Sequence, residues 1–219
     1  MLVIHIISTD DTNDFAGIYE GLDATILINP KSSECKHAII NEKDRIIFIG
    51  HGTEFGLLNQ RLDGYIVDSK MVNLLRGKDI IGIWCNASNF ADRYELTGFF
   101  TSMFISNYNE LVNCGFQLFE NCDIEIERQN KIFASRINKL LSENTPSKEW
   151  AKILYRSLEN EKSFVYYNYD HVSFLLCPFK SCLQVFSDLV TDKLSVAPFS
   201  PFSQCFLFIS FSTTSPSGL

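Results

Sequence analysis

The sequence predicts an α/β fold with a mostly parallel sheet and helices on both faces, in a three-layer sandwich. Short, uninterrupted apolar runs recur along the first two thirds of the chain, which is typical of parallel strands covered on both sides. Polar stretches with helical periodicity lie between them, so strands and helices alternate. At 219 residues, the chain is long enough for one such domain with a substantial core.

Four apolar runs predict the parallel strands, at residues 2–7, 24–28, 45–49 and 80–84. Helices are expected between them, over residues 14–22, 33–40 and 69–76. The last of these has the clearest ends. Asp68 or Ser69 is suited to cap its start, and Gly77 is suited to end it.

Beyond residue 85 the pattern continues less regularly. A polar loop leads to an apolar stretch, residues 98–106, which we interpret as a strand. Helices are expected over residues 108–119, 124–141 and 148–159, with Ser147 as the cap of the third. The sequence SFVYYNY, residues 163–169, is rich in aromatic residues and predicts a late strand.

The composition changes near residue 171. Four of the six prolines follow this point, together with many Ser and Phe and few charged residues, and neither period persists. We therefore expect an α/β domain over residues 1–170 and an irregular or disordered tail over residues 171–219.

Charge and hydropathy exclude several classes of protein. The net charge of -7 argues against nucleic acid as a partner, because binding phosphates requires clustered Lys and Arg. The first residues lack the basic segment and cleavage site of a signal peptide. No apolar run reaches the roughly 20 residues of a membrane helix. We expect a cytoplasmic protein without an integral membrane segment, and the oligomeric state is left open.

The seven cysteines are scattered and odd in number, so buried thiols are expected rather than a disulfide framework. No CxxC pair, HExxH, GxGxxG or GxxxxGK[ST] motif occurs. The sequence therefore predicts neither a metal site nor any other cofactor.

Two strand ends carry residues suited to catalysis. His51 lies between two glycines directly after the strand at 45–49, and Cys85 directly follows the strand at 80–84. One crossover joins these strands, so we expect them to be neighbours, with both side chains at the edge where ligands bind in parallel sheets. A thiolate nucleophile and an imidazole acid/base would then share one substrate carbonyl. Gly50 would allow a sharp turn, and the N–H groups of Gly52 and Cys85 would form an oxyanion hole.

This order of a strand, His51-Gly52, one crossover, a second strand and Cys85 resembles the caspase-like superfamily of cysteine peptidases. The superfamily includes caspases, metacaspases, gingipains, separases and CHAT domains. The resemblance extends to about residue 169 and implies a caspase-like domain with His51 as general acid/base and Cys85 as nucleophile. The sequence WCNAS departs from the caspase Q-A-C-[RQG]-G, and 34 residues separate the pair instead of roughly 50. Small bacterial members are therefore the nearer resemblance, and specificity for aspartate is not implied.

The sequence thus predicts a cysteine endopeptidase that acts on a peptide or protein through a thioester. The residues expected to line its substrate cleft are Glu54, Asn86, Ser88 and Asp92. Each also has a simpler interpretation as a solvated polar residue of a loop or helix. Two alternatives remain for the whole chain: a catalytically inactive caspase-like interaction module, or a flavodoxin-like domain whose strand-end loops bind a small ligand.

Overall fold

The structure is a computed structural model that describes residues 1–8, 10–158 and 161–175. Its elements in chain order are β1 (Leu2–His5), α1 (Asp10–Asn13), a 3-10 helix η1 (Asp14–Ile18), β2 (Thr25–Ile28), α2 (Ser32–Asn41), β3 (Arg45–Ile49), β4 (Gly52–Thr53), β5 (Gly56–Leu58), β6 (Tyr65–Val67), η2 (Ser69–Met71), α3 (Val72–Leu75), β7 (Asp79–Ile83), α4 (Ala87–Arg93), β8 (Gly98–Thr101), α5 (Tyr108–Asn113), α6 (Cys122–Ser142), α7 (Ser147–Arg156), α8 (Ser163–Asp170) and β9 (Val172–Leu175).

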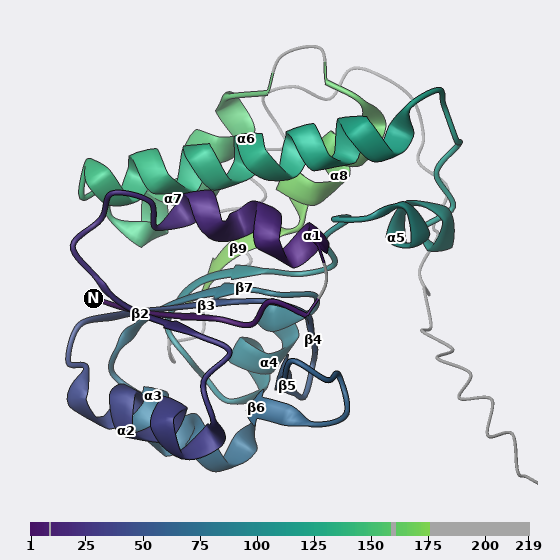
Figure 1. The fold of residues 1–219 in the computed structure, drawn as a ribbon. Coiled ribbons are helices and arrows are strands. Elements are labelled where there is room, and N and C mark those ends of the chain that lie inside the picture. The colour runs from purple at the N-terminus through teal and green to yellow at the C-terminus, as the bar shows by residue number, and fades with distance from the viewer. Residues whose placement is uncertain (9, 159–160, 176–219) are drawn as a thin grey trace, which may run out of the picture. The chain divides into compact units, whose positions relative to one another are not determined.

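A six-stranded sheet in the order β2-β1-β3-β7-β8-β9 forms the centre of this part of the chain (Figure 1). Its neighbouring strands are parallel except β8 and β9 at one edge. A small antiparallel sheet, β4-β5-β6, lies within the crossover from β3 to β7. The predicted α/β class with a mostly parallel sheet is confirmed.

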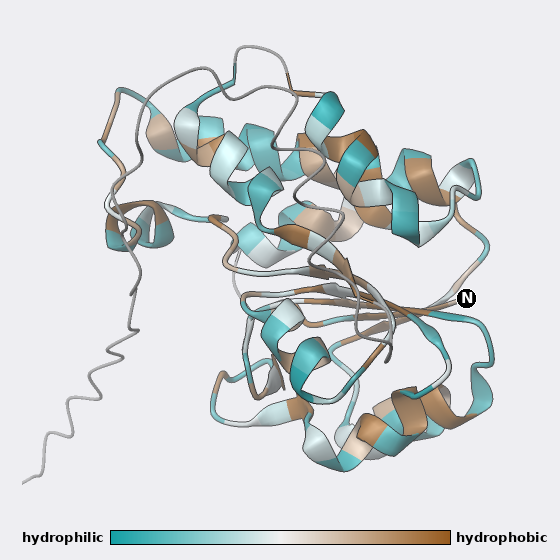
Figure 2. Cartoon of the chain, turned by 180° about the vertical axis from the view of Figure 1, so that it is seen from behind, coloured by the Kyte–Doolittle hydropathy of each residue, from teal (hydrophilic) through white to brown (hydrophobic). Residues whose placement is uncertain are grey.

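Side chains of the sheet pack into two separate hydrophobic clusters. Along β3, Ile47 and Ile49 belong to one cluster, and Ile46 and Phe48 belong to the other. This alternation is what a strand with two covered faces requires. Helices α6, α7 and α8 lie on one side of the sheet, and α2, α3 and α4 lie on the other (Figure 1). Hydrophobic residues lie along the strands and recur at intervals along the helices (Figure 2), and the fold fits a three-layer sandwich.

The element with the clearest expected ends forms as predicted. Helical structure covers Ser69–Met71 and Val72–Leu75, and a side-chain oxygen of Asp68 accepts a hydrogen bond from the Lys70 N–H at 2.8 Å. Gly77 then adopts a φ of 78°, in the left-handed region that favours glycine. In the described residues, no helix has the length and apolar character needed to cross a membrane.

The predicted late strand at residues 163–169 is wrong, because this segment is helix α8. Its buried side chains are Phe164, Val165, Asn168 and Tyr169, a spacing that follows one face of a helix. The strand comes next. Val172–Leu175 forms β9 against β8, in residues that the sequence analysis assigned to the tail. Beyond residue 175 the predicted tail lies outside the described residues.

Several predicted boundaries differ from the structure. Strand β8 ends at Thr101 and α5 ends at Asn113, so both are shorter than expected. Ser147 is the first residue of α7 rather than its cap, and its hydroxyl instead donates to Asp79 Oδ1 at 2.8 Å. Helical structure after β1 begins at Asp10 in α1, earlier than the predicted start at residue 14.

Candidate active site

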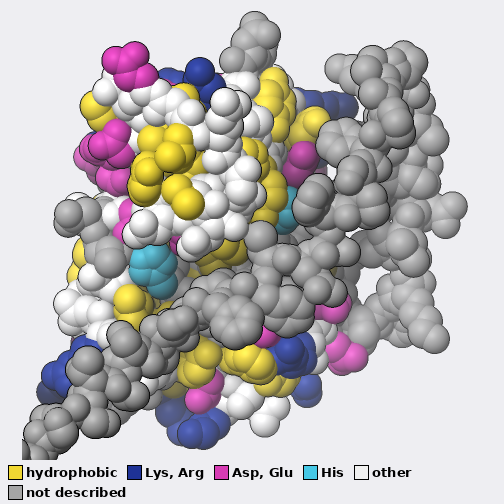
Figure 3. Space-filling view, turned by 90° about the vertical axis from the view of Figure 1, so that its right-hand side faces the viewer, with side chains coloured by type: hydrophobic (Ala, Val, Ile, Leu, Met, Phe, Trp, Pro, Cys, Tyr) yellow, Lys and Arg dark blue, Asp and Glu magenta, His cyan; other side chains and the backbone are white. Residues whose placement is uncertain are grey.

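The candidate site lies at the carboxyl ends of β1, β3 and β7. The chain passes from β1 to β2 on one side and returns to β3 on the other, so the strand order reverses between β1 and β3. In open α/β sheets, ligands bind at such a reversal, next to the carboxyl ends of the strands. Asp11, His51 and Cys85 follow these three strands in the chain. Figure 3 faces this edge of the sheet and shows histidine and acidic side chains at its surface.

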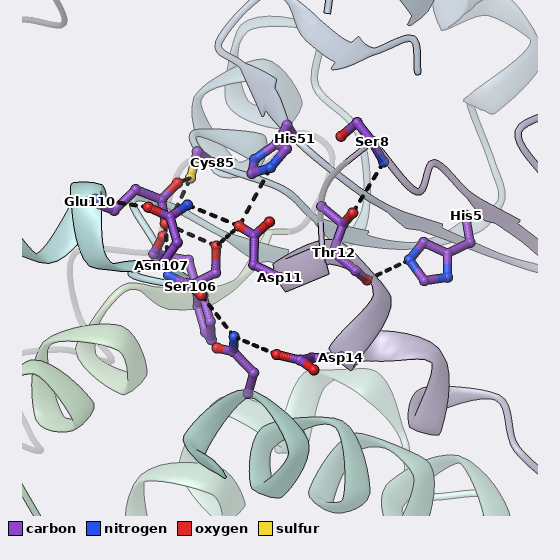
Figure 4. A network of polar contacts seen from close by, with 12 residues as sticks. His5, Ser8, Asp11, Thr12, Asp14, His51, Cys85, Ser106, Asn107 and Glu110 are labelled. Carbon is purple, nitrogen blue, oxygen red and sulfur yellow. Dashed lines mark hydrogen bonds and ion pairs between the residues drawn. The ribbon is translucent and has the colours of Figure 1, made fainter. Parts of the chain in front are cut away.

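The register of β3 and β7 brings the two predicted catalytic residues together. Ile49 pairs with Ile83, and the Gly50 N–H donates to the Ile83 carbonyl at 3.1 Å. His51 and Cys85 therefore leave the sheet at the same level, and both line one cavity of about 20 Å³. This volume has room for about one water molecule. Figure 4 shows both side chains within a single polar network.

A sharp turn presents Cys85 at the end of its strand. Asn86 adopts a left-handed conformation with φ of 64°, which asparagine tolerates better than most residues, and α4 begins at the next residue. Trp84 holds the turn from both sides. Its N–H donates to Thr101 Oγ1 at 3.1 Å, and its Nε1 donates to the Thr53 carbonyl at 3.2 Å.

The two glycines beside His51 serve different purposes. Gly50 has a φ of 151°, which supports the predicted turn after β3. Gly52 is required by packing, because a Cβ atom at this position would lie 2.0 Å from Trp84 Cδ1. The absence of a side chain at Gly52 therefore lets the segment after His51 lie directly against Trp84. Its predicted role in an oxyanion hole stays a prediction.

Asp11 approaches the imidazole of His51. Asp11 Oδ2 lies 3.5 Å from His51 Nε2, and the two side chains are 11% and 19% exposed. The same oxygen accepts hydrogen bonds from Ser106 Oγ and Asn107 Nδ2, each at 2.9 Å. These contacts fix the carboxylate on the Nε2 side of the ring (Figure 4).

The short helix that carries Asp11 is tied to strand β1. His5 is fully buried in β1, and its Nε2 lies 2.8 Å from the Thr12 carbonyl. The Ser8 N–H donates to Thr12 Oγ1 at 3.2 Å. The expectation from sequence had placed no functional residue in this segment, yet these bonds hold Asp11 next to His51.

Glu110 approaches Cys85 from α5. Its Oε1 lies 3.8 Å from Cys85 Sγ, and the Phe104 carbonyl lies 3.5 Å from the same sulfur. The other oxygen, Oε2, accepts from the Ser106 N–H at 2.7 Å and is 2.9 Å from Ser106 Oγ. Since Ser106 Oγ also contacts Asp11, one hydroxyl links the carboxylate beside the cysteine to the carboxylate beside the histidine.

Burial and these carboxylates determine the protonation of the site. Burial raises the pKa of the Cys85 thiol well above its usual value, and the negative charge of Glu110 raises it further. Burial also raises the pKa of Glu110, although hydrogen bonds from Ser106 and the charge of His51 act against this. For His51, burial lowers the pKa, but Asp11 and Glu110 outweigh burial, so its pKa is raised. The resting site therefore favours a protonated thiol.

A much larger cavity, of about 1010 Å³, adjoins this network through Asp11, Ser106 and Asn107. Its lining contains five carboxylates and one lysine, namely Asp11, Asp14, Glu20, Asp123, Glu127 and Lys131. Lys131 forms ion pairs with Glu127 and Asp14. The cavity therefore has an excess of negative charge beside the two predicted catalytic residues.

The four predicted substrate-binding residues lie outside the set that lines the His51 and Cys85 cavity. The Ser88 hydroxyl contacts the Ser102 hydroxyl, and Asp92 is exposed on α4. Asn86 makes the turn after Cys85, and the Glu54 carbonyl accepts a hydrogen bond from Arg93 at 3.4 Å. Their predicted role stays a prediction for a bound substrate.

Sequence reasoning missed Asp11, Ser106, Asn107 and Glu110. Asp11 carried a signal, because it stands in the polar stretch directly after the first strand, where ligand sites occur. Asn107 and Glu110 have the spacing of a helix N-cap and its third residue, and Asn107 Oδ1 does accept from the Glu110 N–H at 3.0 Å. That spacing predicts the start of α5 but not its approach to Cys85.

Comparison with known proteins adds no relative to this geometry: no family model matches the chain, and no curated protein matches it significantly. Among the described residues, no group of three or more His, Cys, Asp or Glu side chains is placed to hold a metal ion.

Proposed function

We propose that the protein is a cysteine endopeptidase that uses Cys85 as nucleophile and His51 as general acid/base. One observation carries the proposal: the two side chains line a common cavity at the carboxyl ends of neighbouring parallel strands. The Asp11 contact with His51 adds the orienting group that a nucleophile and base pair commonly has. The resemblance to caspase-like peptidases, in the chain order of the histidine and the cysteine, agrees with this proposal.

The proposed reaction begins with transfer of the Cys85 proton to His51 in its neutral form, as the sulfur attacks the substrate carbonyl carbon. Because the resting thiol is protonated, this transfer accompanies attack instead of preceding it. His51 then gives the proton to the leaving amine as the C–N bond breaks, which leaves a thioester on Cys85. Water, activated by His51, hydrolyses the thioester, and the thiol is restored. Backbone N–H groups of Gly52 and Cys85 are the proposed donors to the oxyanion.

The acidic cavity indicates which peptides suit the site. Its five carboxylates favour a positively charged side chain of the substrate over an acidic one. Substrates with Lys or Arg next to the scissile bond are therefore expected to be cleaved in preference to substrates with Asp or Glu.

The proposal is tested by incubating a peptide library with the wild-type protein, Cys85→Ala and His51→Ala. Cleavage by the wild type is expected to vanish with Cys85→Ala and to fall by about 10²- to 10⁴-fold with His51→Ala. His37→Ala is a matched control, because His37 is exposed on α2 and its ring contacts Asn41. Cleavage that persists in Cys85→Ala would refute the proposal.

A non-catalytic interaction module of the same fold is the second candidate. Two observations favour it: the cavity at Cys85 holds about one water molecule, and the pKa of its thiol is raised. A library in which the wild type cleaves no peptide would support this candidate instead.

A further inference from the structure

The side chain of Glu110 points at the proposed nucleophile instead of at solvent. It comes from a six-residue helix, α5, that is distant in sequence from β7, and its Oε1 is within 3.8 Å of Cys85 Sγ. In a peptidase site, a carboxylate next to the attacking sulfur is unfavourable, because it opposes formation of the thiolate. The contact therefore calls for an explanation beyond the capping of a helix.

The capping contacts of Glu110 use only one of its two oxygens. Oε2 accepts from the Ser106 N–H and lies within hydrogen-bond distance of Ser106 Oγ, so the start of α5 is satisfied by this atom. Oε1 is then directed to the sulfur, where the S–H proton has the Phe104 carbonyl as its other acceptor. The Glu110 contact stabilises a thiol that retains its proton, whereas the backbone hydrogen bond with Phe104 acts in the opposite direction on the pKa of Cys85.

Two other titratable groups, Cys114 and Asp11, lie near this part of the site and act differently. Cys114 lies on the same side as Glu110 at the end of α5 and raises the pKa of Cys85 when ionised. Asp11 of α1 lies next to His51, which follows β3. Its carboxylate attracts the imidazole when the ring is protonated. Glu110 is thus a carboxylate in direct contact with the sulfur, and its charge is opposite in sign to that of a protonated imidazole.

We propose that Glu110 is a positioning residue that holds Cys85 as an uncharged thiol in the resting protein, and that Cys85 becomes reactive when Glu110 is neutralised or drawn away from the sulfur. The inference rests on the proposed function insofar as Cys85 is the nucleophile. Ser106 makes the restraint sensitive to the rest of the site, since its hydroxyl is shared between Glu110 and Asp11. A cationic substrate group near these carboxylates would weaken the restraint on Cys85.

The substitution Glu110→Gln removes the negative charge of this side chain but keeps its capping contact at the start of α5. The amide oxygen still accepts from the Ser106 N–H, so α5 keeps its start, while the negative charge beside the sulfur is lost. Removing a like charge at this distance is expected to lower the midpoint of Cys85 alkylation by about one to two pH units. Because a less basic thiolate is also a weaker nucleophile, the rate near pH 7 should rise by about three- to tenfold.

The experiment measures alkylation of the full chain by iodoacetamide across pH, with mass spectrometry to follow Cys85 separately from the other cysteines. Glu143→Gln is the matched control: it makes the same change of side chain at the C-terminal end of α6, where Glu143 is exposed and pairs with Lys139 at 3.8 Å. Its Cys85 rate should equal that of the wild type. Glu110→Asp keeps the charge on a shorter side chain, so its rate of Cys85 alkylation should lie between the rates of the wild type and Glu110→Gln.

Two results would overturn the inference: a rate of Cys85 alkylation in folded Glu110→Gln no higher than in wild type, or an equal increase in Glu143→Gln. If Glu110→Gln does not fold, an unchanged rate in Glu110→Asp overturns it in the same way. Failure of the proposed function has a different signature. Cys85 would then react faster in Glu110→Gln, as expected here, while the wild type cleaves no peptide.

Discussion

His5 makes the stability of the fold dependent on pH. It lies fully buried in β1, with Nδ1 3.0 Å from the Tyr19 hydroxyl and Nε2 2.8 Å from the Thr12 carbonyl. A neutral ring satisfies both partners, since Nε2–H donates to the carbonyl and Nδ1 accepts from the hydroxyl. Burial lowers the pKa of His5 from 6.5 to about 4, despite the opposing hydrogen bond with Thr12.

The sign and size of the effect follow from these two values. Between pH 6.5 and about 4, the unfolded chain binds a proton at His5 that the folded protein does not bind. This contribution is therefore fully present above pH 6.5 and is lost as the pH falls toward 4. At about 1.4 kcal/mol for each pH unit, the loss amounts to about 3 kcal/mol in the free energy of unfolding.

Urea unfolding of wild type and His5→Gln, at about pH 7 and about pH 4, measures this quantity. At the higher pH the variant should be less stable by about 1–2 kcal/mol, because a hydrogen-bonded buried side chain is replaced. At the lower pH the difference should shift by about 3 kcal/mol in favour of the variant and so reverse in sign, because glutamine does not titrate. Subtracting the two proteins removes the contributions of other groups, including Asp14 and Glu110, whose pKa values are raised by burial.

His37→Gln serves as the control, since His37 is exposed on α2 and should change stability equally at both pH values. A difference between wild type and His5→Gln that is the same at both pH values would refute the reasoning. It would mean that His5 takes up its proton in the folded protein as readily as in the unfolded chain.

Two further substitutions test the geometry around His51. Asp11→Asn should lower the pKa of His51, because the hydrogen bond and the negative charge that raise it are weakened or removed. NMR titration of the imidazole protons measures this change, and an unchanged pKa would show that the contact has no effect in solution. Gly52→Ala should destabilise the protein by about 1–3 kcal/mol in urea unfolding, because its Cβ would lie 2.0 Å from Trp84 Cδ1. Gly17→Ala is its control, with space for a Cβ at an ordinary contact distance of 3.6 Å; equal effects of the two substitutions would contradict the packing argument.

The segment that sequence reasoning misassigned shows where local patterns fail. Residues 163–169 contain the aromatic and β-branched side chains that favour strands, but they form α8. Packing decided the outcome. Burying Phe164, Val165, Asn168 and Tyr169 on one side requires a helix, and Asn168 is then placed to bond both backbone groups of Ile105. Tertiary contacts overrode a weak local preference.

The sequence by itself determined the α/β class and the placement of His51 and Cys85 at strand ends. Continuous apolar runs such as residues 45–49 can be buried only in strands covered on both sides, and the polar residue that ends such a run must lie at the edge of the sheet. These conclusions depend on neighbours in the chain, which is why they needed no coordinates.

Only the tertiary structure decided which groups surround those two residues. Asp11 reaches His51 across 40 positions, and Glu110 reaches Cys85 across 25. Both approaches depend on the order of strands and on the path of α1 and α5, which no local spacing encodes. The protonation of the site has the same origin, because the pKa values of Cys85, Glu110 and His51 depend on burial and on charges brought together by the fold.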